Sequence, residues 1–407
     1  MKGERVPDRS RSILASSSSR LRPLLLLAGL AGCGRLAPPP AAPPIPREEL
    51  AVSVFLIGDA GAPYPDDPVL VELTQQAAAS PEGSVIAYLG DNLYPRGLPD
   101  STDMVLRKEM ERRLDGQVAV ARNSKRMAYF IPGNHDWARM GADGWNAIRR
   151  SQLFIRTRAQ GFAEQIPSDG CPGPEVLDSL VGLRLVFIDT QWWLHGPLPK
   201  PRRPEAACRA ATEVEFRDQL ITAVKEAGDR AVIVMGHHPL ATAGEHGGHF
   251  TIWDHLFPLR EVKKWFWFPF PLIGSIYPFA RASGVSDQDI SGSENKRLRA
   301  VLEDALKAGP ALLYAGGHDH NLQVFRGPGA EYSVVSGSGY FGHTTQVGTT
   351  RQTVFRAQES GFMRVDLTRS GSIRLGVTVV GPQGKREPFA VWLKEPPKEP
   401  PTETPED

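Results

Sequence analysis

The chain has 407 residues, of which 41% are hydrophobic, 23% are charged and only three are cysteine. This composition is typical of a globular protein with enough apolar residues for a large core. The net charge of +1 excludes a broad basic surface for nucleic acid, and three cysteines are too few for a thiolate metal cluster or a disulfide-rich scaffold.

The N-terminal 33 residues carry the pattern of an export signal. A basic start precedes a short apolar stretch that ends in Leu30-Ala31-Gly32-Cys33. A membrane-spanning helix would need about 20 apolar residues, more than this stretch contains. The ending resembles a bacterial lipoprotein signal, which implies a lipid on Cys33 and a protein of the cell envelope, held at the outer membrane or facing the periplasm. A soluble export signal with an incidental cysteine is the alternative.

Proline-rich segments follow this signal and close the chain. Residues 34–49 predict a semi-rigid tether and residues 394–407 a disordered tail, because segments so rich in proline do not pack as a core. We therefore expect the folded body to span 50–393.

Within the body, short β-rich runs alternate with helical patterns, which predicts an α/β fold. Six runs end in glycine, in a side chain able to bind a metal, or in both: 52–57, 85–89, 127–131, 183–188, 231–235 and 311–314. A helix over 213–227 should bury Val214, Leu220, Ile221 and Val224, and another over 295–306 should be capped by Ser291 or Ser293. The runs 332–335, 361–367 and 373–380 predict antiparallel strands covering a second sheet.

The central motif is Gly90-Asp91-Asn92-Leu93-Tyr94, which follows the apolar run 85–89. A carboxylate just past such a strand lies where α/β sheets place their chemistry. We interpret Asp91 as a bridge between two metal ions and Tyr94 as a phenolate ligand of one of them. A polar turn of no chemical role is the alternative for this stretch taken alone.

The other strand ends complete a candidate ligand set. Its members are Asp59, Asp91, Tyr94, Asn134, His237, His318 and His320. Oxygen and imidazole ligands without thiolate suit iron, zinc or manganese. Seven ligands, one of them bridging, suit two four-ligand sites, and His318 and His320 flank Asp319 in a tight loop so that their rings can reach different ions.

These motifs together resemble the calcineurin-like metallophosphoesterases, and among them the purple acid phosphatases. Many metallophosphoesterases have a histidine where Gly61 stands, and Tyr94 in its place is the purple acid phosphatase pattern. The run 317–323 and Glu245-His246-Gly247 look like the small, tartrate-resistant type. The resemblance covers about residues 52–340 and implies a four-layer α/β/β/α sandwich.

The resemblance also implies roles for single residues. It assigns Asp59, Tyr94 and His320 to a first metal, Asn134, His237 and His318 to a second, and Asp91 to both. The first ion would be Fe(III), coloured by charge transfer from tyrosinate, and the second Fe(II), zinc or manganese. His135 and His246 match the catalytic histidines that hold phosphate and assist the leaving group. His238 replaces a family tyrosine, so its role stays open, while Asp136 and Asp189 are expected to be structural.

Two metal ions held in this way would activate water for attack on phosphorus. We therefore expect an exported phosphatase that hydrolyses phosphate monoesters of a small molecule or a phosphoprotein, with a phosphodiesterase or nucleotidase as the alternative. An inactive binding module would be expected to have lost ligands, whereas this set is complete.

Three further features are less specific. The segment 256–290 looks like an insertion rich in aromatic residues, which could be an interfacial loop on a lipid-anchored protein, a lid, or a loop packed on its own body. Cys171 and Cys208 are expected to form a disulfide in an exported protein. Trp192 and Trp193 fit either the cleft or the core.

Overall fold

The computed structural model describes residues 39–196, 200–201, 206–257, 268–269 and 273–396. The predicted signal, the start of the tether, much of the aromatic insertion and the end of the tail lie outside these residues. Among the residues it does describe, no helix combines the length and the apolar character needed to cross a bilayer.

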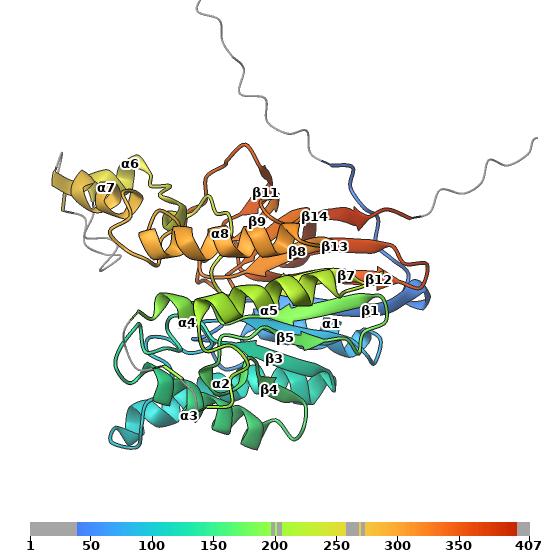
Figure 1. Ribbon diagram of the computed structural model, residues 1–407, viewed down its shortest axis with the longest axis horizontal. Coiled ribbons are helices and arrows are strands. Elements are labelled where there is room, and N and C mark those ends of the chain that lie inside the picture. The colour runs from blue at the N-terminus through green and yellow to red at the C-terminus, as the bar shows by residue number, and fades with distance from the viewer. Residues whose placement is uncertain (1–38, 197–199, 202–205, 258–267, 270–272, 397–407) are drawn as a thin grey trace, which may run out of the picture. The chain divides into compact units, whose positions relative to one another are not determined.

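Two seven-stranded sheets form the centre of the body (Figure 1). The first sheet has the order β14-β13-β12-β1-β2-β3-β4 and the second the order β11-β9-β10-β8-β7-β6-β5. The strands of the first are β1 (Leu50–Ile57), β2 (Val85–Leu89), β3 (Met127–Ile131), β4 (Ala163–Gln165), β12 (Gly361–Thr368), β13 (Ile373–Gly381) and β14 (Gly384–Lys394). The strands of the second are β5 (Glu175–Leu177), β6 (Leu183–Phe187), β7 (Ala231–Met235), β8 (Ala311–Gly316), β9 (Leu322–Arg326), β10 (Tyr332–Ser336) and β11 (Thr353–Ala357).

In each sheet, the strands that lead into the candidate ligands run parallel to one another. β1 to β4 pair in parallel in the first sheet, as do β6, β7 and β8 in the second. The late strands divide between the sheets, because β12 pairs antiparallel with β1, whereas β10 pairs in parallel with β8. β10 also pairs antiparallel with β9, and β12 with β13. The three predicted strands thus have antiparallel partners, but the prediction that they cover a second sheet was wrong for β12 and β13, which extend the first sheet beyond β1.

Helices cover the outer faces. The helices are α1 (Pro68–Ala79), α2 (Met104–Ser124), α3 (Gly144–Arg158), α4 (Thr190–Leu194), α5 (Glu213–Lys225), α6 (Ile252–Leu256), α7 (Ile276–Ala282) and α8 (Ser293–Lys307). Alternation along β1 explains the layers, since Val54 and Leu56 face the second sheet while Phe55 and Ile57 face the cluster that includes α1 and α2. The other sheet packs its outer face on α5 and α8, which lie side by side (Figure 1). The four-layer α/β/β/α fold is thus as predicted.

Two details of the predicted helices were wrong. Val214 is 66% exposed, and Phe216 takes its place on the buried face of α5. Neither serine caps α8 through its side chain; Gly292 is the N-cap, and Asp287 from the preceding loop accepts from the backbone N–H of Glu294 at 3.0 Å.

The described part of the predicted tether touches the body. Ala42 is buried, its N–H donates to the carbonyl of Ala390 in β14, and its own carbonyl accepts from Arg374. At the other end, β14 extends to Lys394, where the tail was expected to begin.

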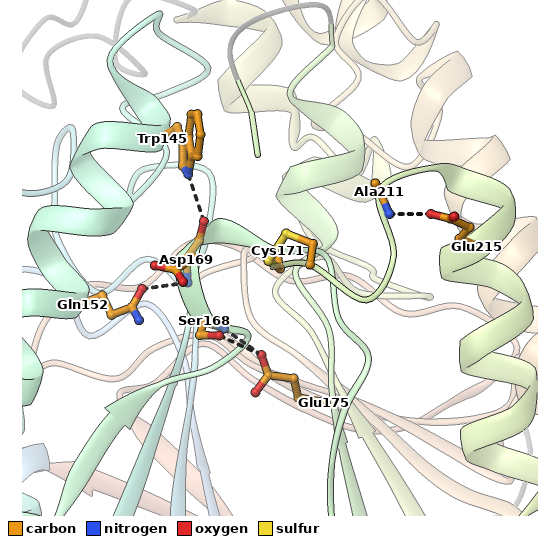
Figure 2. The surroundings of a disulfide bond; sticks show 9 residues. Trp145, Gln152, Ser168, Asp169, Cys171, Glu175, Ala211 and Glu215 are labelled. Atoms are coloured by element: carbon orange, nitrogen blue, oxygen red, sulfur yellow. Dashed lines mark hydrogen bonds between the residues drawn. A yellow bond between two sulfur atoms is a disulfide. The ribbon is translucent and has the colours of Figure 1, made fainter. Parts of the chain in front are cut away.

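A disulfide joins Cys171 to Cys208, which confirms the predicted pairing. Figure 2 shows the hydrogen bonds around it: Trp145 donates to the carbonyl of Asp169, and the side chain of Glu175 accepts from Ser168. The bridge ties the segment before β5 to the chain that leads into α5.

Candidate metal centre

The predicted ligands gather where the parallel strands of both sheets end. Asp59 follows β1, Asp91 follows β2 and Asn134 follows β3, while His237 follows β7 and His318 follows β8. All five are buried. Because the carboxyl ends of β1 to β3 face those of β7 and β8, ligands from the two sheets meet in one place.

One cluster consists of Asn134, His237 and His318. His237 Nε2 lies 2.9 Å from Asn134 Oδ1 and 3.1 Å from His318 Nδ1. The distance between Asn134 Oδ1 and His318 Nδ1 is 3.2 Å. The other ring nitrogen of each histidine faces a backbone carbonyl, of Leu89 at 2.9 Å and of Gln288 at 2.9 Å. A carbonyl only accepts, so those nitrogens carry the protons. Three lone pairs therefore converge, an arrangement that a cation satisfies.

A second cluster consists of Asp59, Tyr94 and His320. The Tyr94 hydroxyl lies 2.9 Å from Asp59 Oδ1 and 3.1 Å from His320 Nε2, and the carboxylate and imidazole atoms are 3.6 Å apart. His318 and His320 thus belong to different clusters, although one residue separates them.

Asp91 lies between the clusters. Its Oδ1 is 3.4 Å from His237 Nε2 and accepts from the backbone N–H of His135 at 2.8 Å. One ligand atom each of Asp59, Asp91 and His237 fall within 4.8 Å of one another. This is the place that a bridging carboxylate would occupy.

The backbone is strained at three of these ligands. Asp59, Asp91 and His318 have φ angles of 58°, 53° and 73°, in the left-handed region that non-glycine residues seldom adopt. Such strain concentrates at functional sites and persists because neighbouring groups hold it. The carboxylate of Asp136 is one such group, since it accepts from the backbone N–H groups of Asn92, Leu93 and Gly133 at 2.8–3.0 Å.

Gly61 explains how a tyrosine stands where many relatives have a histidine. A Cβ at this position would lie 2.9 Å from Cδ2 of the Tyr94 ring and 2.6 Å from the carbonyl oxygen of Asp91. A side chain here would displace the loop that holds Tyr94, so in this chain the position of the phenol requires a glycine at 61.

Electrostatics at the site call for positive charge. Burial, and next the charge of Asp91, raise the pKa of Asp59 well above its usual value. Burial and Asp59 likewise raise the pKa of Tyr94. Burial lowers the pKa of His237 and of His318, so both rings are in the neutral form that binds metal. A carboxylate, a phenol and unprotonated imidazoles are a donor set that fits two metal ions.

The predicted catalytic histidines line the cavity above the clusters. This cavity has a volume of about 760 Å³, and His135, His246, His318 and His320 are among its lining residues. His135 Nδ1 lies 2.7 Å from the carbonyl of Pro95, and the His246 ring centroid lies 3.7 Å from that of His318.

His238 is next to the centre but turned toward the protein. Its Nδ1 lies 2.8 Å from Thr190 Oγ1 and its Nε2 lies 2.9 Å from Gln288 Oε1. Burial and the neighbouring His237 lower its pKa to about 3. Because both ring nitrogens are hydrogen-bonded to protein side chains, we interpret His238 as a residue that packs beside the candidate ligands and does not bind a metal itself.

Asp189 has the structural role that the sequence predicted, whereas one histidine near the site was missed. Asp189 accepts from Trp137 Nε1 and caps α4, and Trp192 and Trp193 are buried in the core rather than in the cleft. His343 was missed, although its ring centroid is 3.8 Å from that of His320. It follows β10 by seven residues, so a search limited to strand ends passes over it; the pair Gly342-His343 was the available signal.

Comparisons with known proteins agree with this geometry. The family model of the calcineurin-like phosphoesterases matches residues 52–267. Purple acid phosphatase 3 of Arabidopsis thaliana is 23% identical over 220 residues, which are 52% of this chain and 55% of that protein. The alignment thus spans about half the length of this curated relative.

Two solved structures share the fold. GAP50, the anchor in the inner membrane complex of Plasmodium, superposes with a TM-score of 0.52 at 16% identity, over 86% of this chain and 90% of that one. PhoD gives a TM-score of 0.51 at 9% identity, over 86% of this chain and 72% of that one.

The family model agrees with the family that the motifs predicted. The chain belongs to the calcineurin-like phosphoesterase family. The matched range ends before His318 and His320, which the fold brings to the other ligands.

Proposed function

We propose that the chain is a dinuclear-metal phosphatase that hydrolyses phosphate monoesters. The observation that carries this proposal is the pair of three-residue clusters on either side of Asp91, with ligand atoms 2.9–3.6 Å apart within each cluster. When bound, two metal ions lower the pKa of water and polarise phosphoryl oxygens. Fe(III) paired with Fe(II), zinc or manganese is the proposed content.

The remaining tasks fall to side chains of the chain itself. His135 and His246 stand on the cavity wall, where their imidazoles can hold the phosphate and protonate the leaving oxygen. An alkoxide leaves slowly without a proton, so His246 matters most for alkyl phosphates.

The charge of the cavity favours monoesters. Arg96 and Arg139 line it together with Asp91 and Glu245, whereas Arg281 in the same wall is already paired with Asp289. Positive charge attracts a monoester dianion more strongly than a diester monoanion. The volume of about 760 Å³ has room for a second ester group, which supports a phosphodiesterase or nucleotidase as the second candidate.

A comparison of substrates and metals tests this proposal. The purified chain, loaded in turn with iron, zinc and manganese, should hydrolyse 4-nitrophenyl phosphate faster than bis(4-nitrophenyl) phosphate. Loss of a residue that only supports a metal ligand lowers activity by about 10–100-fold. His237→Ala should lower activity by more than this, because it removes a proposed ligand. His255→Ala on α6 is the matched control. Faster diester cleavage would favour the second candidate, and full activity of His237→Ala would exclude the metal mechanism.

We propose further that the protein is exported and lipid-anchored through Cys33. The Leu30-Ala31-Gly32-Cys33 ending supports this, and so does the disulfide, because disulfides persist in oxidising compartments. Cys33→Ser should move the protein from the membrane fraction to the soluble fraction of the expressing cell. Unchanged fractionation would contradict the anchor.

The described part of the aromatic segment supports a contact with lipid. Ile273, Ile276 and Phe279 are 64–67% exposed, so most of the surface of each side chain is open to solvent. Replacing all three with serine should weaken binding to liposomes if the segment is interfacial, and change substrate preference if it is a lid.

A further inference from the structure

The chain just after α7 reaches His246. Asp289 Oδ1 lies 2.8 Å from His246 Nδ1. The Asp289 side chain is 1% exposed and that of His246 22%. Arg281 Nη2 also lies near His246 Nδ1, at 3.1 Å, but it donates to the Asp289 carboxylate at the shorter distance of 2.5 Å. A carboxylate only accepts, so its 2.8 Å contact with the ring places the proton of that hydrogen bond on His246 Nδ1. His246 is thereby held with Nε2 as its other nitrogen, in the way that carboxylates orient histidines in other active sites.

Arg281, the next-to-last residue of α7, holds the same carboxylate. Its Nε donates to Asp289 Oδ2 at 2.7 Å and its Nη2 to Oδ1 at 2.5 Å. Two parallel hydrogen bonds fix the plane of the carboxylate as well as its position. The third contact of the guanidinium, from Nη1 to the Tyr277 hydroxyl at 2.8 Å, ties it to its own helix.

The charges of the three groups are consistent with this arrangement. Burial by itself would raise the pKa of Asp289, yet hydrogen bonds from His246 and Arg281 hold that pKa below its usual value. Arg281 remains charged in spite of its burial, because the carboxylate raises its pKa further.

We propose that Arg281 is a positioning residue: through Asp289, it holds His246 by Nδ1 so that Nε2 faces the leaving group. The Nε2 proton of the imidazolium then passes to the leaving oxygen, and the neutral ring that remains keeps its proton on Nδ1. This inference depends on the proposed role of His246 as proton donor. The proposal assigns a function to the end of the inserted segment. Gln288, the residue before Asp289, also contacts the site, because its backbone carbonyl accepts from His318 Nε2.

Substrates that differ in their need for a proton test the proposal. Arg281→Ala should slow kcat for glycerol 2-phosphate by about 10–100-fold, the usual cost of losing such a partner. The same variant should slow 4-nitrophenyl phosphate by less than about threefold, because nitrophenolate leaves without a proton. Arg281→Lys keeps the charge without the two-pronged contact and should fall between, and added guanidinium should restore part of the Arg281→Ala loss.

Arg184→Ala is the matched control. Arg184 makes the same double contact, with Asp178 at 2.8 and 2.6 Å, at the start of β6 and outside the cavity. It should leave the ratio of the two rates unchanged, which separates positioning from a general loss of stability.

A second measurement does not depend on activity. Long-range proton–nitrogen NMR spectra of the zinc-loaded protein should show His246 protonated at Nδ1, with a mixture of tautomers in Arg281→Ala. An unchanged rate ratio or an unchanged tautomer in this variant would overturn the inference. If the wild-type chain hydrolyses neither substrate, the proposed function fails, while the tautomer still decides whether Arg281 positions His246.

Discussion

At the scale of single residues, the absence of a side chain at Gly61 decides where the Tyr94 ring lies in the candidate metal centre. The missing side chain admits the Tyr94 ring, whose hydroxyl then meets Asp59 and His320. If this cluster holds a metal as proposed, the phenol would favour a harder, trivalent ion there than an imidazole would.

Replacing Tyr94 with phenylalanine tests that proposal. Tyr94→Phe removes one of the three ligands of its cluster, so the metal content should fall from about two ions per chain toward one. If iron occupies this position, the visible charge-transfer band should disappear as well. Tyr340→Phe is the control, because it removes a hydroxyl from a neighbouring ring, whose centroid lies 6.5 Å from that of Tyr94. A full metal complement in Tyr94→Phe would contradict the assignment.

Asp189 makes a separate prediction about pH. Burial raises its pKa to about 7, although Trp137 and the backbone of Trp192 donate to it. The unfolded chain should have the ordinary value of about 3.9. Between these values the folded state binds more protons, so stability is highest below pH 4 for this group and is lost as pH rises to 7.

We therefore expect Asp189→Asn to flatten the stability profile. Denaturant unfolding of the wild type should lose about 2–3 kcal/mol more than the variant between pH 5 and pH 8, at about 1.4 kcal/mol per pH unit. Equal losses in the two proteins would show that Asp189 is ionised throughout this range.

At the scale of elements, patterns along the chain predicted the strands better than the helix faces. β2, β3 and β7 begin and end at the predicted residues, because each is a fully apolar run between polar turns. The face of α5 was wrong by one side chain. Val214 lies in the first turn and faces solvent, whereas Phe216 belongs to the apolar cluster that α5 shares with α8.

The disulfide is the element-scale feature with the largest expected effect on stability. Cys171 and Cys208 close a loop of 37 residues, for which the chain-entropy account gives about 4 kcal/mol as an upper value. Cys171→Ser with Cys208→Ser should lower the midpoint of thermal unfolding while leaving the metal content unchanged, because the bridge lies outside the ligand loops. An unchanged midpoint would show that the loop between the cysteines is ordered without the bridge.

At the scale of the whole molecule, the convergence of the seven candidate side chains was predictable from the sequence, but the neighbours that contact them were not. Five of the seven directly follow a glycine near the end of a strand, and that signal is local in the sequence; they are Asp59, Asp91, Asn134, His237 and His318. The contacts of His246 with Arg281, of His318 with Gln288 and of His320 with His343 depend on how distant loops pack. No spacing along the chain encodes such packing, so these partners emerge only from the fold.

Removal of the metals should weaken the whole body, because the ligands come from both sheets. Asp59, Asp91 and Asn134 follow strands of one sheet, whereas His237 and His318 follow strands of the other. Ions held by both would act as cross-links, and a ligand at 1,000 times its Kd stabilises the folded state by about 4 kcal/mol. Dialysis against a chelator should therefore abolish activity and lower the midpoint of thermal unfolding, and added metal should restore both. His237→Ala should have the low midpoint of thermal unfolding even with metal present. If the chelator leaves the midpoint of the wild type unchanged, the sheets are held together by their apolar core alone.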